Sequence, residues 1–149
     1  MISKKLLTLV VAAVFATGCT CKPHQRLGAD SDNIPNQEEG PLSDVHYAFD
    51  SYSLDATAKG IIKSNAEWLK SNPSSKVQVE GHCDERGTNE YNMALGAKRA
   101  RASMEALRSQ GIEASRMSTV SYGEEMPKDP AHNESAWAKN RRAHFKVQN

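Results

Sequence analysis

The segment VQVEGHCDERGTNEYNMALGAKRARASMEAL, residues 77–107, decides the fold. Val77 and Val79 alternate with polar residues and predict a strand that ends at Gly81. A polar loop follows, and a long helix is expected from about Asn89 to a C-terminal stop at Gly111. Apolar side chains recur on this helix at helical spacing and predict its buried face, formed by Met93, Ala97, Ala100, Met104 and Leu107.

Further elements are predicted on both sides of this unit, within residues 44–149. Alternation over residues 45–49 predicts a first strand, and Asp55 is a candidate N-cap for a helix that ends before Asn72-Pro73. A third strand is expected near residues 117–121, a short helix over 135–140 and a final strand over 143–147. The order βαβαβ-(α)β predicts an α+β fold, a two-layer sandwich in which a mixed four-stranded sheet packs on helices.

The N-terminus has the parts of a secretory signal peptide. Lys4 and Lys5 precede an apolar run over residues 6–16, which is shorter than the ~20 residues needed to cross a bilayer. Small residues then lead directly to Cys19, as in a bacterial lipobox. This resemblance implies a signal peptide over residues 1–18 and a lipid on Cys19. An ordinary secretory signal with a chance cysteine is the alternative, and Cys21 fits the motif less well.

Residues 19–43 are expected to form the lipidated cysteine and a flexible linker. The stretch is rich in proline, glycine and polar residues and has few apolar side chains to bury. It is therefore interpreted as a tether between a membrane and the domain. Cys21 and Cys83 could pair in an oxidising compartment, but Cys83 as a small buried residue is the simpler interpretation.

Charge argues against nucleic acid as a partner. The 149 residues have a formal net charge of +1, which falls to −1 if Lys4 and Lys5 are removed with the signal peptide. A near-neutral exported protein has little electrostatic attraction for nucleic acid or for an anionic membrane surface. The short basic run formed by Lys139, Arg141 and Arg142 does not change this balance.

Asp84 and Arg99 are the first candidates for a binding site. Arg99 shares a helix stripe with small or polar residues, Asn92, Gly96 and Ser103, and Asp84 lies in the loop that leads into this helix. Arg99 is thus expected to lie over a shallow floor rather than in the core. An acidic and a basic group that converge in this way can hold a zwitterion, with the carboxylate on the ammonium and the guanidinium on the carboxylate of the ligand. A plain ion pair between Asp84 and Arg99 is the alternative.

Two other chemistries are disfavoured. His82, Cys83 and Asp84 could suggest a hydrolase, but adjacent residues near a strand point to alternating faces and cannot form a relay. His82 is expected to be a hydrogen-bonded residue at the strand end. The five histidines have no second histidine or cysteine at metal-ligand spacing on one helix, so neither a metal nor another cofactor is expected.

Five segments resemble the OmpA-like domain family: residues 45–54, 81–92, 94–102, 121–127 and 132–145. The chain matches the family's helix pattern at Asn92, Leu95, Arg99, Ala100 and Leu107 and departs from it at Gly96 and Ser103. The resemblance implies a domain over residues 44–149 that binds the diaminopimelate of a peptidoglycan stem peptide, with no catalysis. Asp84 and Arg99 take the family's aspartate and arginine positions.

The resemblance also implies the surroundings of this pair and the partners. The loop after the first strand, Asp50, Ser51 and Tyr52, would line one side of the pocket, and Asn92 and Leu95 would form its floor. Apart from the resemblance, two interpretations of Asn140 and Arg141 stay open: they assist the pocket or a partner face, or they belong to a solvated helix end beside a strand. The expected partner besides peptidoglycan is the periplasmic propeller protein of the Tol system. Thr20 after the lipidated cysteine implies an outer-membrane location.

The sequence as a whole predicts an outer-membrane lipoprotein that tethers the membrane to the cell wall. Two alternatives stay open: an adaptor that mainly binds the Tol propeller, and a peptidoglycan hydrolase.

Overall fold

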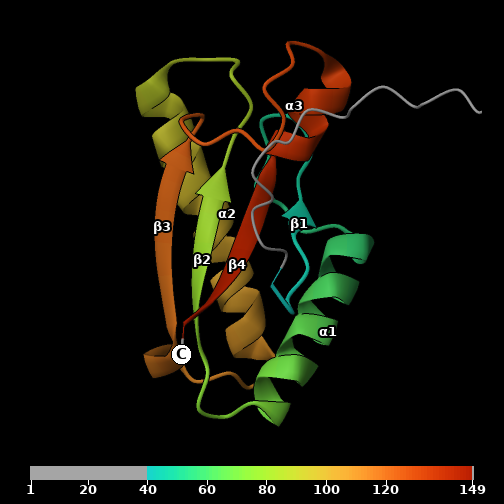
Figure 1. Ribbon diagram of the computed structural model, residues 1–149, viewed down its shortest axis with the longest axis vertical. Helices are drawn as coiled ribbons and strands as arrows, with labels where there is room; N and C mark the ends of the chain where they lie inside the picture. The colour runs from blue at the N-terminus through green and yellow to red at the C-terminus, as the bar shows by residue number, and fades with distance from the viewer. Residues whose placement is uncertain (1–39, 149) are drawn as a thin grey trace, which may run out of the picture. The chain divides into compact units, whose positions relative to one another are not determined.

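The computed structural model describes residues 40–148 and confirms the predicted α+β architecture. The elements, in order, are β1 (Val45–His46), α1 (Ala56–Ser71), β2 (Lys76–His82), α2 (Asn89–Ser109), the 3-10 turn η1 (Ala114–Arg116), β3 (Met117–Gly123), α3 (Glu134–Asn140) and β4 (Arg142–Gln148). The mixed sheet has the order β1-β4-β2-β3, in which β2 and β3 are parallel and β4 is antiparallel to both β1 and β2. Helices α1 and α2 cover one face of this sheet, and α3 lies at one end (Figure 1).

Helix boundaries follow the capping residues. Asp55 accepts a hydrogen bond from the Ala58 N–H at 2.7 Å, so it caps α1 as predicted. Thr88 caps α2 in the same way, by accepting from the Tyr91 N–H at 3.2 Å. Gly111 has a φ of +92°, a left-handed conformation that suits glycine just beyond a helix end.

The first strand is shorter than predicted. Only Val45 and His46 pair with β4, although the Tyr47 N–H still donates to the Arg141 carbonyl at 2.9 Å. The chain then leaves the sheet, and Phe49 is 58% exposed instead of lying in the core. Asp50, with a φ of +51°, turns the chain into the loop before α1. The alternating pattern therefore continues past the end of the strand.

The buried face of α2 also differs from the prediction. Ala97 is exposed, and Met93 and Met104 are only partly buried. The buried residues of α2 include the whole stripe that the sequence predicts to be a shallow floor. They are Asn92, Gly96, Arg99 and Ser103 of that stripe, together with Leu95, Ala100 and Leu107. The Ser103 hydroxyl lies 2.8 Å from the Tyr47 hydroxyl, so a hydrogen bond replaces apolar packing at this point.

Two glycines explain why this polar stripe faces inward. A Cβ atom on Gly81 in β2 would lie 1.9 Å from the carbonyl oxygen of Gly96 in α2. A Cβ on Gly96 would lie 2.3 Å from the Ser121 hydroxyl oxygen. Helix and sheet are therefore in backbone contact at Gly81 and Gly96, where no side chain would fit between them.

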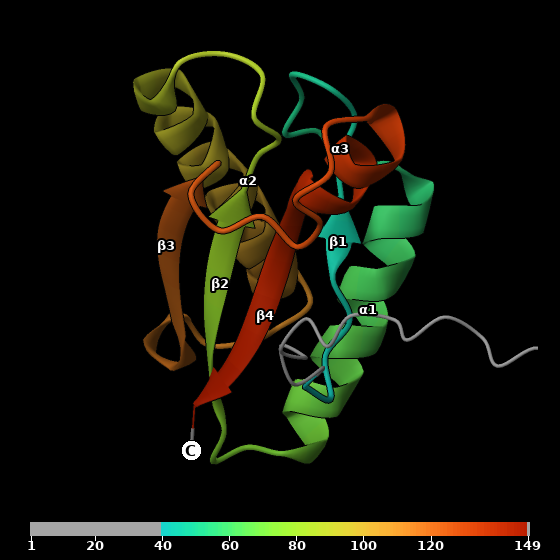
Figure 2. The same cartoon turned by 45° about the horizontal axis from the view of Figure 1, so that its top comes forward.

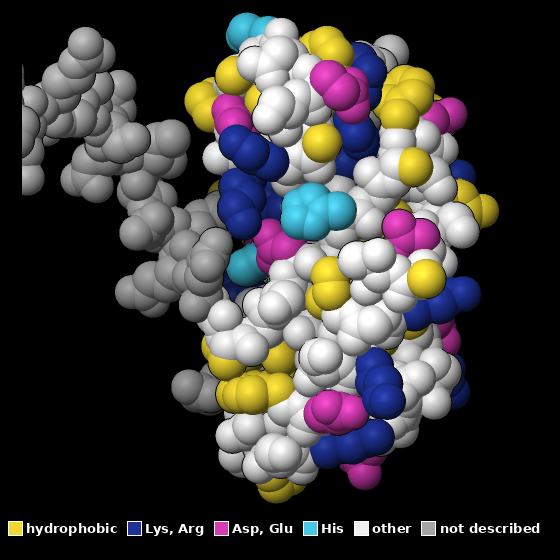
Figure 3. Space-filling view, turned by 90° about the vertical axis from the view of Figure 1, so that its right-hand side faces the viewer, with side chains coloured by type: hydrophobic (Ala, Val, Ile, Leu, Met, Phe, Trp, Pro, Cys, Tyr) yellow, Lys and Arg dark blue, Asp and Glu magenta, His cyan; other side chains and the backbone are white. Residues whose placement is uncertain are grey.

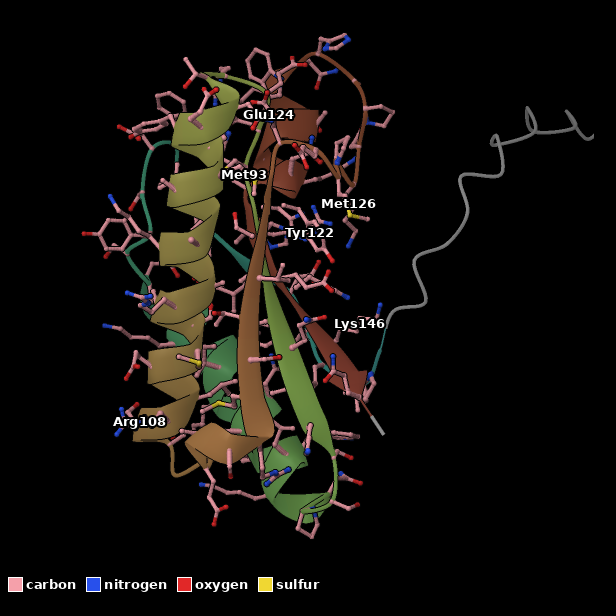
Figure 4. The ribbon with its side chains drawn as sticks, turned by 90° about the vertical axis from the view of Figure 1, so that its left-hand side faces the viewer. Met93, Arg108, Tyr122, Glu124, Met126 and Lys146 are labelled. Carbon is pink, nitrogen blue, oxygen red and sulfur yellow. The ribbon has the colours of Figure 1, made fainter. Side chains whose placement is uncertain are left out.

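The other face of the sheet carries polar and charged side chains. Tyr122, Met126 and Lys146 lie on the side of the sheet away from α2 (Figure 4). Near the start of the described chain, the Asp44 carboxylate accepts from His144 at 2.7 Å and lies 3.5 Å from the Arg142 guanidinium. In a view from the side of the molecule where α1 and α3 lie, acidic, basic and histidine side chains are neighbours on the surface (Figure 3).

The ordered domain extends slightly before the predicted boundary at Asp44. Leu42 belongs to the hydrophobic core, and Ser43 exchanges two backbone hydrogen bonds with the Asn65 side chain. The predicted signal peptide, Cys19 and most of the linker lie outside the described residues, so those interpretations stay predictions. Within residues 40–148, no helix is both long enough and apolar enough to cross a membrane.

Replacing Gly81 by alanine should destabilise the domain by about 2–3 kcal/mol, because the added methyl group overlaps the α2 backbone. Gly60→Ala is the matched control. Nothing lies within 4 Å of a Cβ at this helical position, and alanine there should stabilise by up to about 1 kcal/mol. Urea unfolding followed by circular dichroism compares the two, and equal midpoints would contradict the close helix–sheet contact.

Candidate ligand-binding site

A cavity of about 210 Å³ opens at the end of β2 where the chain turns into α2. Three parts of the fold meet there: the β1–α1 loop, the β2–α2 loop with the first turns of α2, and the end of α3 (Figure 2). The lining residues are Phe49, Asp50, Cys83, Asp84, Arg86, Gly87, Tyr91, Asn92, Leu95, Arg99 and Arg141. We call this cavity the loop pocket. Two of its lining residues are aspartates and three are arginines, so the formal charge of its wall is positive.

Asp84 is held in the wall of the loop pocket by two arginines. The Asp84 side chain is only 4% exposed, and its carboxylate accepts from the Arg86 side chain at 2.8 Å and from Arg141 at 3.1 Å. The Arg86 N–H and Nε donate to its other oxygen at 3.1 and 3.3 Å. Burial opposes ionisation of Asp84, but the hydrogen bonds from Arg86 and Arg141 outweigh it and lower its pKa. Asp84 is therefore a carboxylate at neutral pH.

Arg99 lies beneath the same cavity and is 1% exposed. Its guanidinium donates to three backbone carbonyls, those of Ser51 at 2.9 Å, His82 at 2.8 Å and Ala48 at 3.1 Å. Burial lowers the pKa of Arg99 from its very high usual value, which leaves the group protonated at neutral pH. No carboxylate of residues 40–148 forms a salt bridge with it, so the simple Asp84–Arg99 ion pair is not observed.

The position of Arg99 corrects one expectation. The sequence predicted an arginine on an open, shallow face, whereas the side chain is buried and joins the β1–α1 loop to the end of β2. The physical reason is the close approach of α2 to the sheet at Gly96, which places Arg99 one turn further along, inside the structure. Arg99 is therefore both a charge below the pocket and a structural link.

The other predicted site residues are divided between two places. Asn92 and Leu95 do line the loop pocket, and the Asn92 amide donates to the Asp84 carbonyl at 3.1 Å and to Glu124 at 2.5 Å. Asp50 lines the pocket too, and its carboxylate accepts from the Tyr91 hydroxyl. Ser51 and Tyr52 do not line this pocket. They lie in a neighbouring shallow depression with Lys59 and Ala102.

Several residues at the pocket were not assigned from the sequence. The Arg86 guanidinium lies between two aromatic rings, 4.1 Å from the centre of the Phe49 ring and 4.3 Å from that of Trp137. Trp137 in turn donates to Glu85 at 2.9 Å. Arg86 follows Asp84 by two residues in the same loop, and this spacing was the only available signal. The two rings come from distant segments, which a single sequence does not bring together.

Arg141 and Asn140, whose role was left open, have different places. Arg141 lines the loop pocket and binds Asp84, the Tyr47 carbonyl and Glu134. The Asn140 side chain instead accepts from the backbone N–H groups of Lys128 and Asp129, and so holds the loop before α3.

The geometry of His82 and Cys83 does not suit nucleophilic catalysis. His82 stacks on Tyr122 with 5.5 Å between ring centres, whereas the buried Cys83 lines the loop pocket. Burial raises the pKa of the Cys83 thiol to about 11, so it is protonated at neutral pH. Across residues 40–148, no cluster of three or more histidine, cysteine or acidic side chains could hold a metal ion.

Comparison with known proteins places the fold and the pocket residues in context. The OmpA family model matches residues 46–141. The peptidoglycan-associated lipoprotein of Pasteurella multocida is 39% identical over 143 residues, which cover 95% of each chain. That of Agrobacterium fabrum is 48% identical over 99 residues, which are 66% of this chain and 56% of the relative.

Solved structures of similar proteins share the fold of this domain. The crystal structure of the peptidoglycan-associated lipoprotein from Burkholderia pseudomallei has a TM-score of 0.68 at 43% identity, covering 70% of this chain and 89% of that one. The C-terminal domain of Helicobacter pylori MotB also has a TM-score of 0.68, at 20% identity, with 72% of this chain and 85% of that chain covered. At that identity, the MotB similarity concerns the fold alone.

Substitution of Arg99 by methionine should destabilise the domain by about 3 kcal/mol, because it leaves the buried His82 carbonyl and the part-buried carbonyls of Ala48 and Ser51 without their donor. Arg101→Met, an exposed position on the same helix, is the control and should change stability by less than about 0.5 kcal/mol. Thermal and urea unfolding measure both. A stable Arg99→Met variant would show that these hydrogen bonds are dispensable.

A second prediction concerns acid stability. Burial lowers the pKa of His82 to about 3, below the 6.5 of an unburied histidine. As the pH falls, His82 is therefore protonated in the unfolded chain before it is protonated in the folded domain. The stability that the domain has with His82 neutral is complete above pH 6.5 and is lost as the pH falls toward 3. The expected loss between pH 7 and 5 is about 2 kcal/mol.

Urea titrations at both pH values test this assignment. His82→Phe should flatten the pH dependence, whereas Gly60→Ala, which removes no titratable group and lies in open space on α1, should leave it unchanged. An identical slope in all three proteins would mean that other groups control acid stability.

Proposed function

This chain belongs to the OmpA family, and we propose that its domain binds peptidoglycan non-covalently through the loop pocket. The observation that carries the proposal is the placement of the Asp84 carboxylate beside the positive charges of Arg99 and Arg141 in one cavity. The relatives named peptidoglycan-associated lipoprotein, at 39–48% identity, support the same ligand.

The charges of the pocket suit diaminopimelate in the stem peptide. Its free end carries an ammonium and a carboxylate on the same carbon, so the ammonium would pair with Asp84. The carboxylate would be attracted by Arg99 from below, since no carboxylate of the described domain neutralises that side chain. Asn92 and Leu95 would form the floor, as the family resemblance implied. Binding requires no chemical step, and the domain would act without catalysis.

Within the cell, the domain would serve as one end of a tether. A lipid on Cys19 would hold the chain at the outer membrane, and the linker would let the domain reach the wall from the periplasm. Confinement to a membrane raises the effective concentration of binding sites, so many individually weak contacts can hold the two layers together. Envelope integrity and cell division would depend on this connection.

We further propose that the periplasmic propeller protein of the Tol system is a second partner. The supporting feature is the exposed rim of the loop pocket, where Phe49 and Tyr91 are 58% and 52% exposed. Exposed aromatic side chains of this kind are typical of protein interfaces. A partner on this rim would compete with the wall.

Sedimentation with purified sacculi tests wall binding. Asp84→Asn should weaken co-sedimentation by about 30-fold or more, because it removes the carboxylate that pairs with the ligand. Asp129→Asn, which removes an acid from an ion pair with Lys139 outside the loop pocket, is the control and should sediment normally. Thermal melts establish that both variants are folded. Full sedimentation of Asp84→Asn would refute the site.

The two alternatives predict different outcomes. An adaptor for the Tol propeller would capture that protein from wall-free extracts even as the Asp84→Asn variant, and the native domain would sediment poorly with sacculi. A hydrolase would release soluble muropeptides from sacculi, and the amount released would grow with time. Competition of sedimentation by a free diaminopimelate peptide, without muropeptide release, would favour wall binding over both.

A further inference from the structure

The carboxylate assigned to the ligand's ammonium is already fully hydrogen-bonded. Asp84 accepts from four donors, three of which belong to Arg86 and one to Arg141. A carboxylate has about four lone-pair positions, so a ligand ammonium needs one of these donors to leave. The need to displace a donor from Asp84 limits which ligands can bind, given the proposed function of the loop pocket in binding peptidoglycan.

Arg141 is poorly placed to leave. Its side chain is 9% exposed, and the same guanidinium also donates to the Tyr47 carbonyl at 3.2 Å and to Glu134 at 2.8 Å. Moving it would break three hydrogen bonds in three directions. Arg141 is thus a fixed backing for Asp84.

Arg86 is the movable donor. Its side chain is 31% exposed and contacts the Phe49 and Trp137 rings beside the cavity that it lines. A second acid is close by, since Glu134 lies 3.4 Å from the other end of the guanidinium. The side chain can therefore leave Asp84 and still have an acidic neighbour and an aromatic surface.

We propose that Arg86 is an internal competitor for Asp84 that restricts the loop pocket to ligands with a carboxylate beside the ammonium. A ligand with a zwitterionic end leaves the net charge of the pocket unchanged. Its ammonium replaces the Arg86 guanidinium on Asp84, and its carboxylate becomes a new anion for Arg86 or Arg99. A lone ammonium, such as a lysine side chain, displaces Arg86 and brings no new anion, so Arg86 loses Asp84 and keeps only Glu134, which it already contacts. The ammonium would also add a positive charge to a wall with three arginines and two aspartates. Arg86 is thus a specificity-determining residue, which selects diaminopimelate over lysine in otherwise identical stem peptides.

Calorimetric titration with two soluble stem peptides tests this role. The peptides are identical except for the third residue, which is either meso-diaminopimelate or L-lysine. The wild-type protein should prefer the diaminopimelate peptide. In Arg86→Gln, the lysine peptide should gain about five- to tenfold in affinity, while the diaminopimelate peptide changes by less than about threefold. The ratio between the affinities for the diaminopimelate peptide and the lysine peptide should therefore be smaller in Arg86→Gln than in the wild-type protein.

Arg108→Gln is the matched control. Arg108 is an exposed arginine at the opposite end of α2, far from Glu124 and the pocket mouth (Figure 4), and its substitution should leave both affinities unchanged. Thermal melts verify that both variants fold, and Arg141 still supplies a partner for Asp84 in Arg86→Gln.

Each outcome is decisive. An unchanged preference in Arg86→Gln overturns the competitor role while peptidoglycan binding stands. Loss of the diaminopimelate peptide in that variant overturns it too, because Arg86 would then be a direct ligand contact. If neither peptide binds to the wild-type protein or to Arg86→Gln, the proposed function fails together with the inference.

Discussion

One buried guanidinium holds the site together. Arg99 donates to carbonyls on both sides of the loop pocket, at Ala48 and Ser51 in one loop and at His82 at the end of β2. Without a charged partner in the described domain, it is stabilised by these dipoles and by the Tyr47 ring, whose centre is 5.3 Å away. The shape of the cavity and the positive potential at its base therefore have the same source. A site built in this way cannot change its charge without changing its loops.

Around this base, the pocket has a fixed side and an adjustable side. Asn92 and Arg141 are buried and bind the backbone of neighbouring loops, so they set where Asp84 lies. Arg86 and the aromatic rings at the rim are more exposed, and Arg86 contacts Asp84 and Glu134 as well as the two rings. A rigid base provides geometry at little entropic cost on binding, and a mobile rim can respond to what enters.

Much of the fold could be predicted from local signals. Asp55 and Asn72-Pro73 marked the ends of α1, and Gly111 the end of α2, because capping and proline effects depend on a few adjacent residues. The buried face of α2 could not be inferred from apolar periodicity, since the helix packs through Gly96 and Ser103 against a glycine and a tyrosine from other elements. Of the residues that the sequence proposes for a site, Asp84, Asn92 and Leu95 line the loop pocket. The Arg86 stack could not be predicted, because Phe49 and Trp137 meet only in the folded chain.

The order of the strands has a consequence for biosynthesis. The last strand in sequence, β4, lies in the interior of the sheet between β1 and β2, and its first residues follow directly on Arg141. In a nascent chain that lacks β4, β1 has no strand to pair with, because β4 is its only neighbour in the described sheet. The domain therefore completes its sheet, and positions Arg141 beside Asp84, only after nearly the whole chain has emerged. Until then the loop pocket lacks Arg141, one of the side chains that line it.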